Sequence, residues 1–147
     1  MNFKKTLIIL SLFVPSICLA ANSYDQYKET VTNCIDIEKN KAPLAAHDLD
    51  GLKPEDVEKY LFLIKDIRIQ QCSSQEEMKA LVDELAASDK PVDAKDLGYR
   101  YLSIYNNRRI SELSDVEKEK LNQIDASLQG KSLEVNLLDL REKLKDN

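Results

Sequence analysis

The sequence of 147 residues contains no tryptophan, one histidine and only three glycines. So few glycines disfavour a β-sandwich or a β-barrel, because the many tight turns of those folds draw heavily on glycine. No run of alternating apolar residues is bounded by hairpin turns, so no β-strand is predicted. The chain also lacks a glycine-rich phosphate-binding loop, which argues against a nucleotide-dependent enzyme.

A recognisable catalytic or metal-binding set is missing as well. His47 is the only imidazole, and zinc needs three or four ligands. No serine occupies a strand–turn–helix motif that would make it a nucleophile. The stretch ending at Gly51 suggests a calcium loop, but the first and twelfth positions, Ala46 and Val57, are not acids. We therefore predict a non-enzymatic protein with no cofactor and no metal.

One enzymatic alternative stays open. Acidic residues are frequent along the chain, and the distance between two carboxylates depends on the fold rather than on the sequence spacing. A carboxylate-based enzyme acting on the cell wall is thus a further hypothesis.

Residues 1–20 have the pattern of a cleavable secretory signal. Lys4 and Lys5 precede an apolar stretch that is too short to span a bilayer, and small residues end it at Ala20. A lipoprotein signal, with lipid on Cys18, is less favoured because residues 15–17 do not match the lipid-modification pattern. We expect a periplasmic or secreted protein without a stable membrane span, in which residues 21–147 form a single domain.

The balance of charge narrows the possible partners. The formal net charge of −5 becomes two units more negative when Lys4 and Lys5 leave with the signal. An acidic exported protein is a poor candidate for binding nucleic acid or an anionic membrane surface.

Two cysteines, Cys34 and Cys72, remain after Cys18 is removed with the signal. An even number of cysteines in an oxidising compartment indicates a disulfide. A redox-active pair or a metal site is the alternative, but the chain has no C-x-x-C motif. In the chain-entropy model a bridge closing a loop of this length stabilises the fold by roughly 4 kcal/mol.

Helical periodicity predicts an all-α domain of about six helices, orthogonal or bundle-like. The central helix spans residues 54–72, begins at Pro54 and is apolar over most of its circumference, which suits the middle of a bundle. Ser23 is the expected N-cap of the first helix. The remaining helices are expected over residues 23–40, 74–88, from 93 to beyond 105, 114–128 and 132–145.

Several of these helices carry one apolar face that we expect to point inward. The third helix should bury Met78, Leu81, Val82 and Leu85. The fourth should bury a face that includes Tyr101 and Tyr105. Capping boxes are predicted at Ser74–Glu77 and at Ser114–Glu117, and Asp93 and Gly130 should mark a helix start and a helix end. The last helix has leucines at 133, 137, 140 and 144 and is expected to dock loosely on the domain; pairing with another chain stays open.

The stretch 97–111 contains three tyrosines, three arginines and no acid, within a chain that is otherwise acidic. Tyr101, Tyr105, Arg108 and Arg109 fall on one helical face. Tyrosine and arginine dominate protein–protein hot spots, and an arginine over a tyrosine ring adds cation–π attraction. We predict a contact surface for a protein with an acidic surface. The alternative is that both tyrosines are core residues and both arginines only favour the helix dipole.

The first helix after the signal carries Tyr24, Tyr27, Lys28, Val31, Cys34 and Ile35. This pattern, which spans residues 24–35, resembles the start of the periplasmic immunity proteins that neutralise type VI secretion amidase effectors. The resemblance implies a small, all-helical, often dimeric protein that blocks the active site of an effector. No downstream motif matches, so it assigns no inhibitory residue.

The leading hypothesis is therefore an exported, non-enzymatic helical protein that binds another protein, with an immunity-type inhibitor as its most concrete form. A small-molecule binder with a cavity between helices is the alternative. A homo-oligomer is compatible with either.

Overall fold

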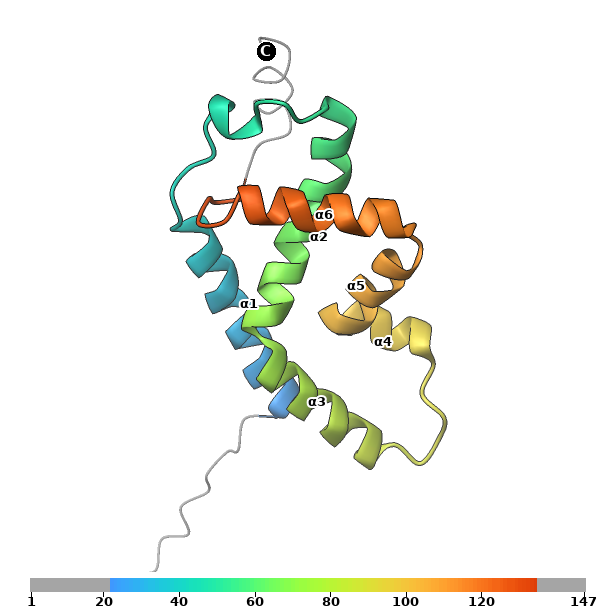
Figure 1. Cartoon of the computed structure of the whole chain (residues 1–147). Helices are drawn as coiled ribbons and strands as arrows, with labels where there is room; N and C mark the ends of the chain where they lie inside the picture. The colour runs from blue at the N-terminus through green and yellow to red at the C-terminus, as the bar shows by residue number, and fades with distance from the viewer. Residues whose placement is uncertain (1–21, 135–147) are drawn as a thin grey trace, which may run out of the picture.

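The computed structural model describes residues 22–134, and within this range the protein is all-α (Figure 1). It contains six α-helices and one 3-10 turn, η1 (Ala46–Leu49). The helices are α1 (Ser23–Lys39), α2 (Pro54–Cys72), α3 (Ser74–Ala87), α4 (Ala94–Arg100), α5 (Leu102–Ser111) and α6 (Asp115–Ser127). The predicted all-α class is confirmed. The predicted signal at 1–20 and most of the predicted helix 132–145 lie outside the described residues.

Helix α2 is the centre of the larger hydrophobic cluster, as expected. It begins with Pro54 at its first turn, followed by Glu55 and Asp56, where acids interact favourably with the helix dipole. Helix α6 lies across it (Figure 1), and the residues between them are almost all aliphatic. The buried members of this aliphatic cluster are Leu44, Leu49, Val57, Tyr60, Leu61, Leu63, Ile64, Leu121, Ile124, Leu128 and Leu133.

The chain turns sharply after α6, and this turn corrects one prediction. Gly130 has φ +81°, a conformation that glycine adopts without a steric cost. The N–H of Ser132 then donates to Ala42 O at 2.7 Å, and Leu133 is buried in the aliphatic cluster. The predicted helix is thus wrong for residues 132–134, because Leu133 packs in the core instead of starting a helical leucine seam.

A second, smaller cluster is built mainly from tyrosine. Its buried residues are Tyr27, Ala80, Leu97 and Tyr101, and Tyr24 packs against them. The rings of Tyr27 and Tyr101 are stacked with centroids 5.6 Å apart, while Tyr24 meets Tyr101 edge-on at 5.7 Å. This tyrosine cluster joins α1, α3 and the α4–α5 pair.

The Cys34–Cys72 disulfide links α1 to the C-terminal end of α2, with Cα atoms 6.0 Å apart. The predicted bridge is confirmed. It connects a helix of the tyrosine cluster to the central helix of the aliphatic cluster.

The helix expected from residue 93 to beyond 105 is two helices, because the backbone at Tyr101 is extended (φ −121°, ψ 120°). The break is stabilised from outside the segment. The N–H of Leu102 donates to the Tyr27 hydroxyl at 3.2 Å, and the N–H of Ser103 donates to the Glu77 carboxylate at 2.7 Å. These groups from α1 and α3 satisfy the first N–H groups of α5, so a continuous helix is not needed to pair them.

The predicted caps are confirmed in part. Ser114 and Glu117 form a capping box, and the Asp93 side chain accepts from the N–H of Lys95 at 2.8 Å. The box predicted at Ser74–Glu77 is wrong, because Glu77 is buried against α5 instead of reaching back to the helix start.

The cap expected at Ser23 falls one residue earlier. Asn22 caps α1, and its side chain accepts from the N–H of Tyr24 at 3.1 Å.

Candidate interaction surfaces

Tyr101, one of the four residues predicted to contact a partner, lies in the core. It is 1% exposed, and its hydroxyl donates to Glu84 at 2.7 Å. Burial, reinforced by the hydrogen bond to Glu84, raises the pKa of the Tyr101 phenol well above its ordinary range. Tyr101 therefore matches the alternative interpretation, in which it packs and does not meet a partner.

The other three predicted residues are at least partly accessible on α5. Tyr105 is 46% exposed, which corrects its expected position on the inner face. Arg108 is more exposed still, and it pairs with Glu112 at 3.7 Å, where both side chains are largely open to solvent. Arg109 is more constrained, because it pairs with Asp66 at 2.7 Å and its guanidinium carbon lies 5.2 Å from the centre of the Tyr105 ring.

Tyr99 joins these residues, although the sequence pattern did not point to it. It is 77% exposed, and a small hollow at the α4–α5 break is lined by Tyr99 and Tyr105 together with Gly98, Arg100, Tyr101 and Leu102. A continuous helix would have placed Tyr99 and Tyr105 on different faces. The break at Tyr101 sets both beside one hollow, and no local sequence signal announces that break.

The base of this hollow is held by buried polar contacts. Glu77 is 2% exposed and accepts both from the N–H of Ser103 and from the Tyr27 hydroxyl, the latter at 3.4 Å. Burial raises the pKa of the Tyr27 phenol well above its ordinary range. The start of α5 is thus fixed to both α1 and α3.

Helix α3 carries an exposed apolar stripe that overturns its predicted burial. Met78, Val82 and Leu85 are 62%, 54% and 48% exposed. The buried residues of α3 are instead Glu77 and Ala80. The periodicity correctly indicated a helix, but the face that packs inward is chosen by the polar contacts of Glu77 and by close packing at Ala80.

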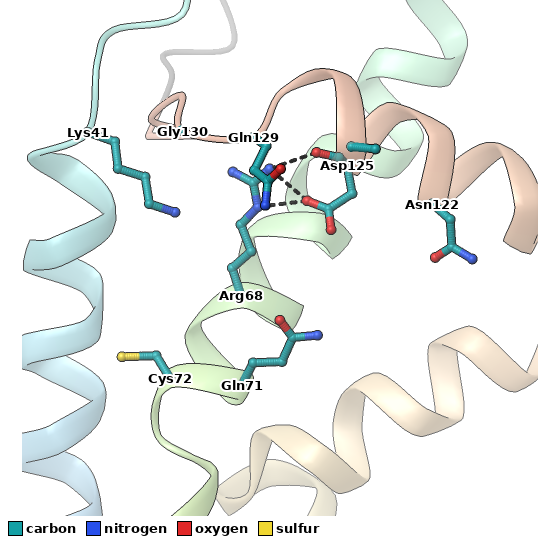
Figure 2. A pocket seen from close by; sticks show the side chains of 9 residues that line it. Lys41, Arg68, Gln71, Cys72, Asn122, Asp125, Gln129 and Gly130 are labelled. Atoms are coloured by element: carbon teal, nitrogen blue, oxygen red, sulfur yellow. Dashed lines mark hydrogen bonds and ion pairs between the residues drawn. The ribbon is translucent and has the colours of Figure 1, made fainter.

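An open polar cleft of about 610 Å³ lies between the ends of α1, α2 and α6. Figure 2 shows its lining, which contains three carboxamides, Gln71, Asn122 and Gln129, around Arg68 and Lys41. No aromatic side chain lines it. Cys72 also lines the cleft, so the disulfide borders it.

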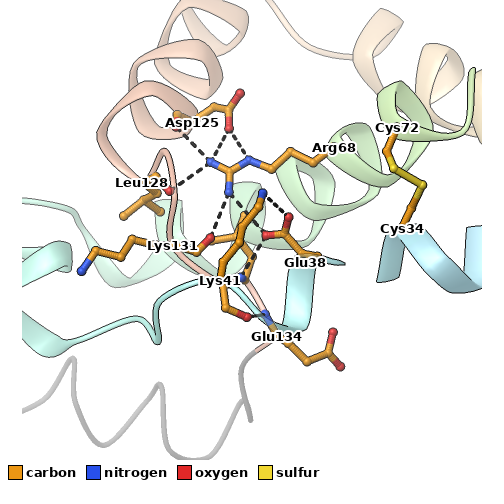
Figure 3. A network of polar contacts seen from close by, with 11 residues as sticks. Cys34, Glu38, Lys41, Arg68, Cys72, Asp125, Leu128, Lys131 and Glu134 are labelled. Carbon is orange, nitrogen blue, oxygen red and sulfur yellow. Dashed lines mark hydrogen bonds and ion pairs between the residues drawn. A yellow bond between two sulfur atoms is a disulfide. The ribbon is translucent and has the colours of Figure 1, made fainter. Parts of the chain in front are cut away.

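Arg68, at the floor of the cleft, is fully engaged by the protein (Figure 3). Its Nε donates to Asp125 at 2.7 Å, and its Nη2 donates to the backbone carbonyls of Asp125 and Leu128, each at 3.1 Å. Its Nη1 donates to Lys131 O at 3.2 Å and to Glu38 at 3.4 Å. Arg68 thereby caps the C-terminal carbonyls of α6 and has no donor left for a ligand.

Glu38 completes this network. It is 3% exposed, forms an ion pair with Lys41, and accepts from the N–H of Leu133 at 3.2 Å. Because Glu38 and Asp125 balance Lys41 and Arg68, the cleft carries no unpaired charge among these four groups. A ligand for it would have to be neutral and polar.

His47 is largely exposed and lies 3.5 Å from Asp48. Among residues 22–134, no group of three or more histidine, cysteine or acidic side chains is placed to hold a metal ion. No helix in that range is both long and apolar enough to cross a membrane.

The comparisons with known proteins found nothing similar: no protein-family model, no curated protein and no solved structure matches this chain.

Proposed function

We propose that the protein is exported and acts by binding another protein through the tyrosine–arginine surface of α4 and α5, which consists of Tyr99, Tyr105, Arg108 and Arg109. The observation that carries the proposal is the pair of exposed tyrosines beside one hollow. Large aromatic side chains next to arginine are typical of binding hot spots, especially on a base that does not have to be ordered on binding. The buried contacts of Glu77 and Tyr27 supply that base.

The charge of this surface favours an acidic partner. Arg108 is exposed, and its pair with Glu112 is long and solvated, so the pair adds little stability and is easily exchanged for a partner's carboxylate. Arg109 is already neutralised by Asp66, and it acts mainly by holding the Tyr105 ring from one side.

Export is supported by the signal pattern of residues 1–20 and by the disulfide, which is typical of oxidising compartments. An immunity-type inhibitor of a periplasmic effector is the most concrete form of the proposal. The residues that resemble such proteins include Tyr27 and Cys34, which are buried. They therefore serve packing and the disulfide, and the inhibitory contacts would come from α4 and α5.

Affinity capture from a periplasmic extract tests the proposal. We expect the protein to retain a specific partner, and the double variant Tyr105→Ala/Arg108→Glu to bind that partner at least about tenfold more weakly, since two hot-spot contacts are lost. Val116→Ala, at another strongly exposed apolar position, is the matched control. Equal recovery by the wild type and the double variant would contradict the proposal. Arg109→Glu is avoided because it would also break the Asp66 pair.

A small-molecule binder is the second candidate, and the polar cleft is the observation that favours it. Three carboxamides, each with donors and an acceptor, suit a neutral ligand rich in hydrogen-bonding groups. Native mass spectrometry of the purified protein should then show a bound ligand, which Gln71→Leu/Asn122→Leu would abolish. A wild-type spectrum with the protein mass alone would count against this candidate.

A further inference from the structure

The two cysteines of the disulfide differ sharply in exposure. Cys34 is 3% exposed, whereas Cys72, the last residue of α2, is open to solvent. Cys72 also lines the polar cleft of about 610 Å³, and Cys34 does not belong to the described residues that line it. Figure 2 shows the Cys72 side chain at the edge of this cleft. A small molecule in the cleft can therefore approach one sulfur atom of the bridge, while the protein covers the other.

A second link joins the same two helices one turn away from the disulfide. Glu38 on α1 lies four residues after Cys34, and Arg68 on α2 lies four residues before Cys72. The Glu38 carboxylate accepts from Arg68 Nη1 at 3.4 Å (Figure 3). Residues four apart share a helix face, so the ion pair and the disulfide lie side by side between α1 and α2. The ion pair does not depend on the sulfur–sulfur bond, so it keeps Cys34 beside Cys72 when that bond is broken.

Thiol–disulfide exchange at this bridge favours the accessible sulfur. A thiolate attacks one sulfur atom of a disulfide, and the rate depends on access to that atom. Attack from the cleft forms a new bond to Cys72 Sγ and breaks the bond between the two cysteines. The electron pair of the broken bond leaves on Cys34 Sγ, which takes up the proton that the attacking thiol lost. One disulfide replaces another, so the step needs no oxidant or reductant besides the thiol itself.

The cleft favours a small polar thiol without net charge. Gln71, Asn122 and Gln129 line it with carboxamides, which offer both donors and acceptors. The charges of Lys41 and Arg68 are balanced by acids of the protein. A zwitterionic amino-acid thiol, such as free cysteine, has the size, polarity and net charge that suit this lining.

We propose that Cys72 is a site of reversible thiolation, at which a small polar thiol in the cleft forms a mixed disulfide. Cys34 is the buried thiol that afterwards attacks Cys72 Sγ, releases the small thiol and restores the bridge. An accessible cysteine next to a second, resolving cysteine is the usual arrangement of redox-responsive sites. The inference is independent of the proposed function, because it uses the opposite end of α2 from Pro54 and no partner protein.

Mass spectrometry of the mature protein incubated with free cysteine tests the site. After an acid quench and digestion, we expect one added cysteine per chain, at least about tenfold more often on Cys72 than on Cys34. The same incubation in urea is the control, because unfolding opens both positions and should remove the preference. An adduct divided equally between the two positions in the folded protein, an adduct mainly on Cys34, or no adduct before unfolding would overturn the proposal.

Arg68→Met tests the second link. Without the guanidinium, Cys34 is held less closely to Cys72 and restores the bridge less often. The Cys72 adduct should therefore accumulate at least about threefold more at the same concentration of free cysteine. Arg108→Met, at an exposed arginine, is the control and should leave the adduct level unchanged. The digest separates this result from simple unfolding, which would also thiolate Cys34. An unchanged level in Arg68→Met, or a gain shared equally by Cys34, would contradict the role of Cys34 in the proposal.

Discussion

The two hydrophobic clusters of this protein are built in different ways. The aliphatic cluster packs α2 and α6 with leucine, isoleucine and valine, and its polar contacts lie around Arg68 at the edge of the cluster. The tyrosine cluster is smaller, and its polar contacts run through its middle, from Tyr27 and Glu77 to the start of α5. Apolar packing is tolerant of detail, whereas a buried carboxylate requires each of its hydrogen bonds.

The difference coincides in part with where exposed apolar side chains are found. Within residues 22–134, most of the exposed large apolar side chains lie on α3, α4 and α5, around the tyrosine cluster, whereas Ile37 and Val116 lie on α1 and α6. We infer that the aliphatic cluster provides most of the stability and that the helices around the tyrosine cluster present the binding surfaces.

Of the changes that test this comparison, removing the disulfide is expected to have the largest effect on the free energy of unfolding. Cys34→Ser/Cys72→Ser should lower the free energy of unfolding by roughly 4 kcal/mol, because the unfolded chain regains the freedom that a 38-residue separation allows. Urea unfolding of the oxidised wild type and the double variant measures this. As the urea concentration rises, α1 should be the first helix of the variant to unfold, since Cys34 ties α1 to α2.

Arg68→Met should have the second largest effect and lower the free energy of unfolding by about 3 kcal/mol. Glu38 and the last carbonyls of α6 then lose their charged donor inside the protein. The methionine keeps the apolar stem, so the change isolates the guanidinium. Arg108→Met, at an exposed arginine, is the control and should change stability by less than about 0.5 kcal/mol. If both variants lower the free energy of unfolding to a similar degree, the Arg68 network is not needed to stabilise the aliphatic cluster.

Glu77→Ala tests the tyrosine cluster and should cost about 1–3 kcal/mol, since the N–H of Ser103 and the Tyr27 hydroxyl lose a buried acceptor. Glu77→Gln retains an acceptor oxygen and should cost less. Thermal unfolding followed by circular dichroism compares them, with Glu76→Ala as the neighbouring control. If Glu77→Gln is as damaging as Glu77→Ala, the charge and not the hydrogen bond holds α5.

These contrasts explain which features the sequence could predict. The central helix, its start at Pro54, the disulfide and the box at Ser114–Glu117 follow from periodicity, cysteine count and local capping. The break at Tyr101 and the exposure of Val82 do not, because they depend on Glu77 and Tyr27, which reach α5 from distant parts of the chain.

The candidate surface was predictable to a similar degree. The composition of the stretch 97–111 alone points to this surface, and Tyr105 and Arg108 are accessible. Its geometry was not predictable, because it depends on the break in the helix at Tyr101. The break adds Tyr99 to the exposed surface and removes Tyr101 from it.

The smallest expected effect concerns Glu117, which pairs with Lys59 between α2 and α6. The Lys59 contact, followed by the N–H and hydroxyl of Ser114, lowers the pKa of Glu117 from 4.5 to about 2. Because the folded pKa is the lower one, the stabilisation is complete above pH 4.5 and is lost as the pH falls toward 2. Urea midpoints across this range should fall more in the wild type than in Glu117→Gln, and salt should reduce the difference.

Native-state hydrogen exchange tests most directly the claim that the two clusters contribute unequally. Amides in the middle of α2 and α6 should exchange only through global unfolding, whereas those of α4 and α5 should open at a clearly lower free energy. Equal protection of α5 and α2, with one common opening free energy, would contradict the claim that the aliphatic cluster provides most of the stability.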